Sequence, residues 1–285
     1  MMYYIYELAR IFSCKFSLQF MYSLAEKIAI LYHFLSVKDR QAVESNLRFI
    51  ISKDAAQKNN LHKLSRNMYI NFGKYLVDFL RFEKVNIQFI NKNIKIFGQD
   101  NLDEALKHGK GVIMLSCHIG NWELAGGMVG ILGYPLNAIA LSHKDNKVNN
   151  FFINQRKMLK MHTISIGISL KKCFRVLKEN QLLAILADRD FSENGKEVMF
   201  FGRKALLPKG PAVFSLRTKA AIVPCFMIRE PNNKFAFYME KPIYPVSTNN
   251  PENDIGTLMN TYLKLIENYV RAYPDQWCVF RKIWN

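Results

Sequence analysis

The sequence has few cysteines, and no cysteine or histidine spacing in it is typical of a metal site. Its five cysteines are odd in number and scattered, and no C-x-x-C, H-E-x-x-H or H-x-H pattern occurs. A disulfide framework needs paired cysteines, and a structural zinc site usually shows closely spaced ligands. We therefore predict no disulfide framework, no metal site and a reducing compartment.

The sequence also lacks a long uncharged apolar run. Residues 1–37 are rich in Phe, Tyr, Ile and Leu, but charges interrupt them at Glu7, Arg10, Lys15 and Glu26. No uncharged window there approaches the roughly 18–20 residues that a membrane-spanning helix needs. A small-residue cleavage site after a clean apolar core is missing too, which argues against a cleaved signal peptide. Two interpretations stay open: an amphipathic segment on a membrane surface, and a helical pair packed on the domain.

Acidic residues are few as well. Lys and Arg number 40 against 23 Asp and Glu, which gives a formal net charge of +17. This excess says nothing about the fold, but it indicates an anionic partner: nucleic acid, an anionic membrane surface or a phosphorylated substrate. Because no recognised DNA- or RNA-binding motif occurs, we predict no nucleic-acid partner. A hydrophobic content of 49% excludes a disordered chain.

The chain alternates between strand and helix patterns after a helical start. Residues 7–82 are mostly helical by periodicity, residues 86–101 are predicted to be extended, and a short helix follows at 103–107. We predict strands at 112–116, 136–141, 163–166, 182–187, 221–228 and 234–239, an extended stretch at 196–201, and helices at 122–129, 146–161, 170–179, 211–218 and 254–271. This alternation predicts an α/β fold with a mixed, mostly parallel central sheet, helices on both faces and an N-terminal helical segment. The expected parts are residues 1–82 and 83–285, joined in one continuous structural unit.

The strongest chemical signal is a histidine and a carboxylate five positions apart. His118 follows the predicted strand at 112–116, and Glu123 falls in the first turn of the next helix, which Asn121 caps. Sites gather at the carboxyl ends of strands in open α/β sheets. A neutral imidazole oriented by a carboxylate can take a proton from a hydroxyl group. We predict a general-base pair in which ionised Glu123 fixes the His118 tautomer; a polar strand end beside a helix cap is the alternative.

Two residues close to His118, Cys117 and Gly120, also have predicted roles. Cys117 continues the buried strand, so we predict a small buried hydrophobic residue rather than a thiol nucleophile. Gly120 has no side chain, and we expect it to let a substrate approach the backbone closely.

Other candidate residues lie in three later segments. Arg156, in the basic helix at 146–161, is a candidate for stabilising an oxyanion, although a solvated face explains most of that helix's lysines. Lys209 precedes a predicted helix N-terminus, where a phosphate can bind. The third segment, around Asp188 at a strand end, can orient a phosphosugar or form a loop ion-pair network. The candidate substrate-binding residues are Asn121, Trp122, Asp188, Arg189, Asp190, Gly202, Arg203 and Lys209.

Taken together, these segments resemble the bacterial lipid A biosynthesis acyltransferases, the late acyltransferases of the lysophospholipid-acyltransferase-like superfamily. The first block, S-C-H-I-G-N-W-E, is similar to the family's H-x-x-x-x-[DE] block. Later segments are similar to its D-x-D, V-x-F-F-G-x-x-A and P-[DE]-Q-W blocks. The matching segments, in order, are 116–123, 187–191, 198–205, 208–212, 222–226 and 273–277.

The resemblance implies a glycerol-phosphate-acyltransferase-like fold and transfer of a fatty acyl chain, without a cofactor, from acyl carrier protein or coenzyme A. The implied acceptor is a hydroxyl of a phosphorylated glucosamine-disaccharide lipid A precursor. It also implies that His118 is the base, that Glu123 completes the pair and that Arg156 lies near the thioester. The family's usual location, the cytoplasmic face of the bacterial inner membrane, implies peripheral or monotopic attachment to that anionic surface.

Three other functions were considered. The nearest is acyl transfer to another lipid, such as a glycerol phosphate, a lysophospholipid or an amino-acid lipid. The others are a basic nucleic-acid-binding protein and a membrane-bound structural protein that has lost catalysis. The intact pair of His118 and Glu123 favours an enzyme.

Overall fold

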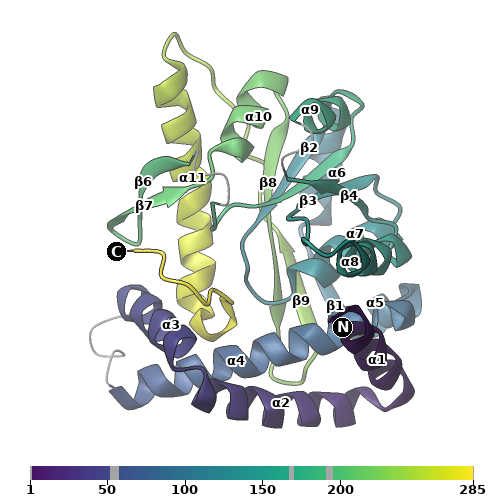
Figure 1. Ribbon diagram of the computed structural model, residues 1–285. Coiled ribbons are helices and arrows are strands. Elements are labelled where there is room, and N and C mark those ends of the chain that lie inside the picture. Colours follow the sequence, from purple (N-terminus) through teal and green to yellow (C-terminus); the bar gives the residue numbers. More distant parts are fainter. Residues whose placement is uncertain (1, 52–57, 167–169, 191–194, 285) are drawn as a thin grey trace.

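The computed structural model describes residues 2–51, 58–166, 170–190 and 195–284. Within these residues a seven-stranded sheet forms the centre, in the order β1-β9-β8-β2-β5-β3-β4 (Figure 1). Its neighbours pair in parallel except β8 and β9, so β1 and β9 run opposite to the other five strands. The strands are β1 (Ile94–Phe97), β2 (Val112–Ser116), β3 (Leu136–Ala140), β4 (His162–Ser165), β5 (Leu182–Leu186), β8 (Ala221–Arg229) and β9 (Phe235–Met239). The predicted mixed, mostly parallel α/β fold is confirmed.

Helices cover both faces of the sheet because strand side chains alternate between two cores. Ile113 and Leu115 of β2 face one core, and Val112 and Met114 face the other. The helices packed against the first core are α9 (Leu170–Lys178), α10 (Gly210–Thr218) and α11 (Pro251–Ala272). Those packed against the second are α5 (Ile87–Asn93), α6 (Gln99–Lys107), α7 (Trp122–Ile131) and α8 (Asn146–Met158).

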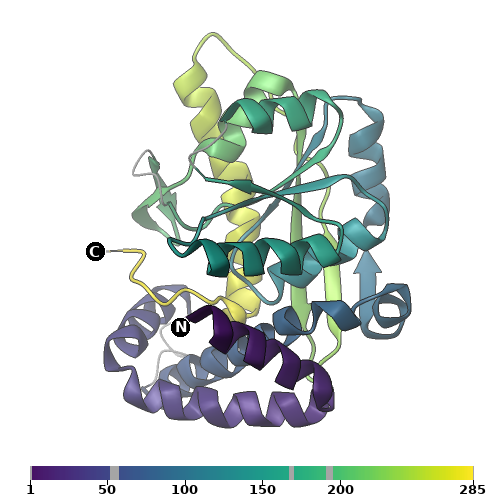
Figure 2. The same ribbon diagram turned by 45° about the vertical axis from the view of Figure 1, so that its right-hand side comes forward.

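The N-terminal helices form a layer at one end of the sheet, seen in purple and blue at the bottom of both views (Figures 1 and 2). They are α1 (Met2–Lys15), α2 (Leu18–Leu35), α3 (Val37–Ile50) and α4 (Lys58–Leu80), followed by the 3-10 turn η1 (Phe82–Lys84). The C-terminal segment runs over this layer after the 3-10 turn η2 (Pro274–Gln276). Asn46 of α3 ties the two together, because its amide donates to the backbone oxygen of Arg281 at 2.8 Å.

The sequence pattern was wrong at residues 87–93 and correct but incomplete at residues 196–201. Residues 87–93, predicted to be extended, form α5, because Asn86 caps a helix by accepting from the Phe89 backbone at 2.9 Å. The extended stretch at 196–201 was assigned no partner, yet β6 (Lys196–Phe200) pairs with β7 (Arg203–Leu207) in an antiparallel hairpin apart from the main sheet. The cap is a local contact that the apolar pattern did not reveal, whereas the hairpin depends on a second segment.

Among the residues that the structure describes, no helix combines the length and the apolar character needed to cross a bilayer. Many large apolar side chains of α1 and α2 are nevertheless exposed, with Leu8 67% and Phe34 73% accessible.

Candidate active site

His118 meets a carboxylate, and that carboxylate is Asp188. Strands β2 and β5 are parallel neighbours, with Ser116 opposite Leu186, so the residues after each strand reach the same edge of the sheet. The Nδ1 atom of His118 lies 2.7 Å from Oδ1 of Asp188, and the His118 backbone amide donates to Oδ2 at 2.9 Å. The predicted partner, Glu123, is therefore wrong as the group that fixes the His118 tautomer. Asp188, predicted to bind substrate, takes that position instead.

Trp277 helps to hold Asp188 in its ionised form. Its indole Nε1 donates to Oδ2 of Asp188 at 2.8 Å, and the carboxylate is fully buried. Burial alone acts to raise the pKa of Asp188, but the charge of His118 and the hydrogen bonds from His118 and Trp277 outweigh it and leave that pKa lowered. Asp188 is therefore a fixed, ionised acceptor for the imidazole ring.

The C-terminal segment forms one wall of this site. Ile119 and Trp277 make an antiparallel bridge, the Gly120 amide donates to Gln276 at 2.9 Å, and the Cys278 amide donates to the His118 oxygen at 2.7 Å. The P-[DE]-Q-W segment thus pairs with the loop that carries His118. This segment was recognised by its resemblance to a family motif, but its residues were assigned no role. The local sequence does not show which loop they pair with.

Gly120 is required for a reason other than the one predicted. Its φ is +60°, and a Cβ atom there would lie 1.8 Å from the backbone oxygen of Met227. The close approach comes from β8 rather than from a substrate. Any side chain at this position would push the His118 loop away from β8.

Glu123 binds Arg156 instead of His118. Arg156 donates from Nη2 to Oε1 of Glu123 at 2.6 Å and from Nε to Oε2 at 2.9 Å, a two-pronged ion pair between α7 and α8. Both side chains are only 12% exposed. Burial acts to lower the pKa of Arg156, but Glu123 outweighs it and leaves that pKa raised, so the guanidinium stays charged. Because Nε and Nη2 hold Glu123, only Nη1 lies outside the ion pair.

Asn121, predicted to bind substrate, is a buried structural residue. Its Oδ1 accepts from the Leu124 amide at 3.0 Å and caps α7, while its Nδ2 donates to Oδ2 of Asp78 at 2.7 Å. Asp78 also binds Tyr22 and Arg229 in a buried network that joins α2, α4 and β8. The prediction is wrong because both ends of the amide are used inside the protein.

Trp122 lies beside His118. Its ring meets the His118 ring edge-on, with centroids 5.1 Å apart, and stacks on Tyr75 of α4 at 4.2 Å. This contact agrees with the predicted position of Trp122 at the site. Cys117 is fully buried, and burial raises the pKa of its thiol well above the usual value, so it stays protonated. The prediction of a buried hydrophobic role is confirmed.

The remaining candidate residues lie in three separate segments. Arg189 and Asp190 follow Asp188 directly, and the oxygen of Asp190 accepts from Arg281 Nη2 at 2.9 Å. Gly202 lies in the β6–β7 turn, and the next residue, Arg203, places its guanidinium 3.8 Å from the centre of the Phe49 ring of α3. Lys209 is the N-cap of α10. Substrate binding by these residues stays a prediction.

The Phe-Phe-Gly segment, residues 200–202, contacts the site through Trp277. The rings of Phe200 and Phe201 lie 6.2 and 6.3 Å from the Trp277 ring, and Trp277 in turn holds Asp188. Aromatic side chains of the hairpin thus fix the indole that orients the carboxylate. No local sequence pattern predicts these contacts, because they join three separate segments of the chain.

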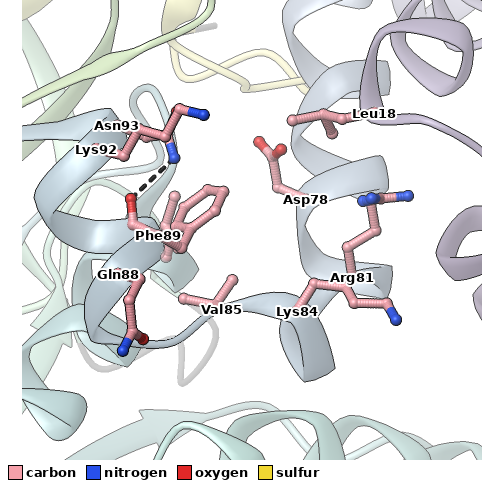
Figure 3. Close-up of a pocket in the computed structure, with 10 residues that line it drawn as sticks. Leu18, Asp78, Arg81, Lys84, Val85, Gln88, Phe89, Lys92 and Asn93 are labelled. Carbon is pink, nitrogen blue, oxygen red and sulfur yellow. Dashed lines mark hydrogen bonds between the residues drawn. The ribbon is translucent and has the colours of Figure 1, made fainter.

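A pocket of about 380 Å³ opens between α4 and α5 (Figure 3). Leu18, Val85, Phe89 and Leu124 give it an apolar lining, and Arg81, Lys84 and Lys92 add positive charge, with Asp78, Gln88 and Asn93 completing the wall. Its lining, taken over the described residues, includes neither His118 nor Asp188. The pocket is therefore separate from the histidine–aspartate pair.

The comparison with protein families shows which class of enzyme has this fold and this histidine–aspartate pair. Residues 3–285 match the family described as bacterial lipid A biosynthesis acyltransferase. Because the match extends over nearly the whole sequence, the chain belongs to this family and is an O-acyltransferase.

Curated relatives act on more than one lipid. A phosphatidylinositol mannoside acyltransferase of Mycobacterium tuberculosis is 26% identical over 220 residues, 75% of this chain and 68% of that protein. The Mycolicibacterium smegmatis protein of the same name is 22% identical, covering 86% of this chain and 79% of its own length. A lipid A biosynthesis palmitoleoyltransferase of Escherichia coli is 23% identical, covering 66% and 60%.

Among solved structures, the 1-acyl-sn-glycerophosphate acyltransferase of Thermotoga maritima aligns with a TM-score of 0.39 and 11% identity. The alignment covers 86% of this chain and 97% of that one.

Proposed function

We propose that this protein moves a fatty acyl chain from an acyl carrier protein thioester to a hydroxyl of a phosphorylated glucosamine-disaccharide lipid A precursor, with His118 as the general base. The observation that carries the proposal is the bond between Nδ1 of His118 and the buried carboxylate of Asp188. With Nδ1 held as a donor, Nε2 is the ring nitrogen that accepts a proton.

The proposed reaction needs no covalent acyl-enzyme. Nε2 of His118 takes the proton of the acceptor hydroxyl, and the oxygen attacks the thioester carbonyl. The tetrahedral intermediate collapses, the carbon–sulfur bond breaks, and the imidazolium returns its proton to the leaving thiolate. Ionised Asp188 stabilises the imidazolium between these steps. Nη1 of Arg156 or backbone N–H groups stabilise the oxyanion.

Charge supports an acidic donor and a phosphorylated acceptor. The chain carries a formal net charge of +17, and acyl carrier protein is acidic. Arg189 follows Asp188 directly, and Arg281 donates from Nη2 to the backbone oxygen of Asp190 at 2.9 Å, so two arginines belong to the segment around Asp188. Guanidinium groups suit the geometry of phosphate oxygens.

The second candidate acceptor is a phosphatidylinositol mannoside. It is favoured by the longer alignments with the mycobacterial relatives, which cover 75% and 86% of this chain against 66% for the Escherichia coli relative. The pair of His118 and Asp188 would serve either acceptor, because a general base needs only a hydroxyl group to act on.

Direct assay of the purified protein separates the acceptors. We expect mass spectrometry to show an acylated product with acyl carrier protein thioester and a lipid A precursor, and much less product with a phosphatidylinositol mannoside or a lysophospholipid. Acyl coenzyme A replaces the carrier-protein thioester in a parallel reaction. Product formed only from the mannoside would move the assignment to the second candidate, and no product from any acceptor would contradict both.

We infer that the protein works as a peripheral protein on the anionic inner face of the bacterial inner membrane, with α1 and α2 against the lipid. The support is the row of exposed apolar side chains on these helices. They include Tyr4, Ile5, Leu8, Ile11, Phe12, Phe16, Phe20, Ile28, Leu31, Phe34 and Leu35. An amphipathic surface of this kind binds the headgroup region, and anionic lipids strengthen the binding of a basic protein.

Acidic substitutions on α2 are expected to weaken membrane binding. Leu31 and Phe34 are 59% and 73% exposed, and they lie three residues apart on one side of the helix. Changing both to Glu removes apolar area and adds negative charge, so binding to vesicles with anionic lipid should fall at least about tenfold. Vesicle sedimentation measures this.

The matched control is Val246→Glu. Val246 is 77% exposed but lies in the loop before α11, outside the α1–α2 surface. It should keep normal vesicle binding. Equal binding by the double variant and the wild type would rule out α2 as the lipid-contacting surface.

A further inference from the structure

Three potential metal ligands from three different helices converge in the N-terminal layer. His33 comes from the last turn of α2, Glu44 from α3 and His62 from α4. Each offers one ligand atom, and these atoms all lie within 4.8 Å of one another. Nδ1 of His62 is 3.5 Å from Oε1 of Glu44, and the rings of His33 and His62 are 4.9 Å apart. No other group of this kind occurs in the part of the chain that the structure describes.

The chemistry of the three donors suits a divalent transition metal. Two imidazoles and one carboxylate form a donor set that zinc sites use, with a water molecule as the fourth ligand. Zinc bonds of about 2.0–2.2 Å place neighbouring ligand atoms about 3.3 Å apart. The distances between the ligand atoms, now up to 4.8 Å, must therefore shorten by about 1.5 Å at most. His62 is exposed and can turn to do so, whereas His33 is buried and held.

The surroundings of His33 fix the orientation of its ring. Ser65, fully buried on α4, lies 3.1 Å from Nε2 of His33, and such outer hydrogen bonds orient metal-binding imidazoles.

We propose that His33, Glu44 and His62 form a binding site for a divalent transition metal, with Zn²⁺ as the best fit. The ion would join α2, α3 and α4 beside Tyr69, whose ring lies 4.9 Å from the His33 ring and 5.0 Å from the ring of Phe280 in the C-terminal segment. Its role is structural, and it is independent of the acyl-transfer chemistry.

The test uses the full-length purified protein, first freed of metal with a chelator and then titrated with Zn²⁺, and with Co²⁺ for its visible absorption. We expect one ion bound per chain and an upward shift in Tm of about 5 °C when Zn²⁺ is about 100-fold above its Kd. His62→Ala removes an exposed ligand, and Glu44→Gln keeps the size of the side chain but removes the charge. Each should weaken metal binding at least about tenfold and abolish the Tm shift.

The control is His162→Ala, which removes an exposed histidine of β4 outside the cluster and should bind Zn²⁺ like the wild type. The proposal is overturned if the wild type does not bind Zn²⁺, or if His62→Ala and Glu44→Gln bind it as tightly as the wild type. Loss of binding in His162→Ala to the same extent would also overturn it, because it would assign the binding to scattered surface histidines. The readout is metal binding, so it stands whether or not the acceptor assay succeeds.

Discussion

The His118→Ala variant is expected to lose acyl transfer by about 10²–10⁴-fold or more, with substrate binding preserved. The alanine removes the imidazole ring, which is hydrogen-bonded to the buried Asp188 carboxylate and serves as the proposed base. Without a base, the acceptor hydroxyl must attack the thioester while it still carries its proton. The loss should therefore fall on kcat, with KM close to the wild-type value.

Two measurements make this result specific. The backbone bonds of His118 to Asp188 and Cys278 do not need the ring, so the variant should fold, with a lower melting temperature because the buried Asp188 carboxylate loses its ring partner. His162→Ala, at an exposed position, should transfer acyl chains at the wild-type rate. Near-normal transfer by a folded His118→Ala protein would remove His118 from the mechanism.

The Asp188→Asn variant is expected to lose about 10⁴-fold in kcat, the loss that reversal of a histidine tautomer causes in a Ser-His-Asp triad. Oδ2 of Asp188 accepts from the His118 amide and from Trp277 Nε1, and Oδ1 accepts from the ring. In asparagine the single oxygen must meet the two fixed N–H donors, so the NH₂ group faces Nδ1 of His118. That nitrogen then becomes an acceptor, the ring proton moves to Nε2, and Nε2 cannot take the proton of the hydroxyl.

Glu123→Gln is the comparison that tells the two carboxylates apart. Glu123 binds Arg156, so its amide variant weakens an ion pair that holds α7 to α8 but leaves Nδ1 of His118 bonded to Asp188. We expect a smaller loss of kcat and a larger loss of stability, because the Arg156 charge stays buried without its partner. Activity assays and thermal unfolding of both variants measure this. A Glu123→Gln loss in kcat larger than that of Asp188→Asn would assign the orienting role to Glu123 after all.

Trp277 shows why part of the site escaped prediction. Its segment was recognised as a family signature, yet its contact with Asp188 crosses 89 residues of sequence. The indole reaches the carboxylate only because the C-terminal segment pairs with the His118 loop. Such a pairing depends on strand order, and strand order is absent from local periodicity.

The strands of the central sheet were predictable because their apolar runs are short and end at turn residues. The five residues from Val112 to Ser116 are such a run, and β2 has these same limits in the structure. Residues 87–93 were predicted to be extended, but they form a helix that Asn86 caps. The β6–β7 hairpin needed its partner strand to be known before it could be assigned.

The sequence by itself determined the fold class, the position of His118 at the end of a buried strand and the family to which the chain belongs. The fold class and the position of His118 depend on residues close together in the chain, and the family depends on motifs that occur in a set order along it. Only the tertiary structure decided which carboxylate meets His118. Asp188 reaches it because β5 lies next to β2 in the sheet, whereas Glu123, only five residues away, sits on a helix that Arg156 holds toward α8.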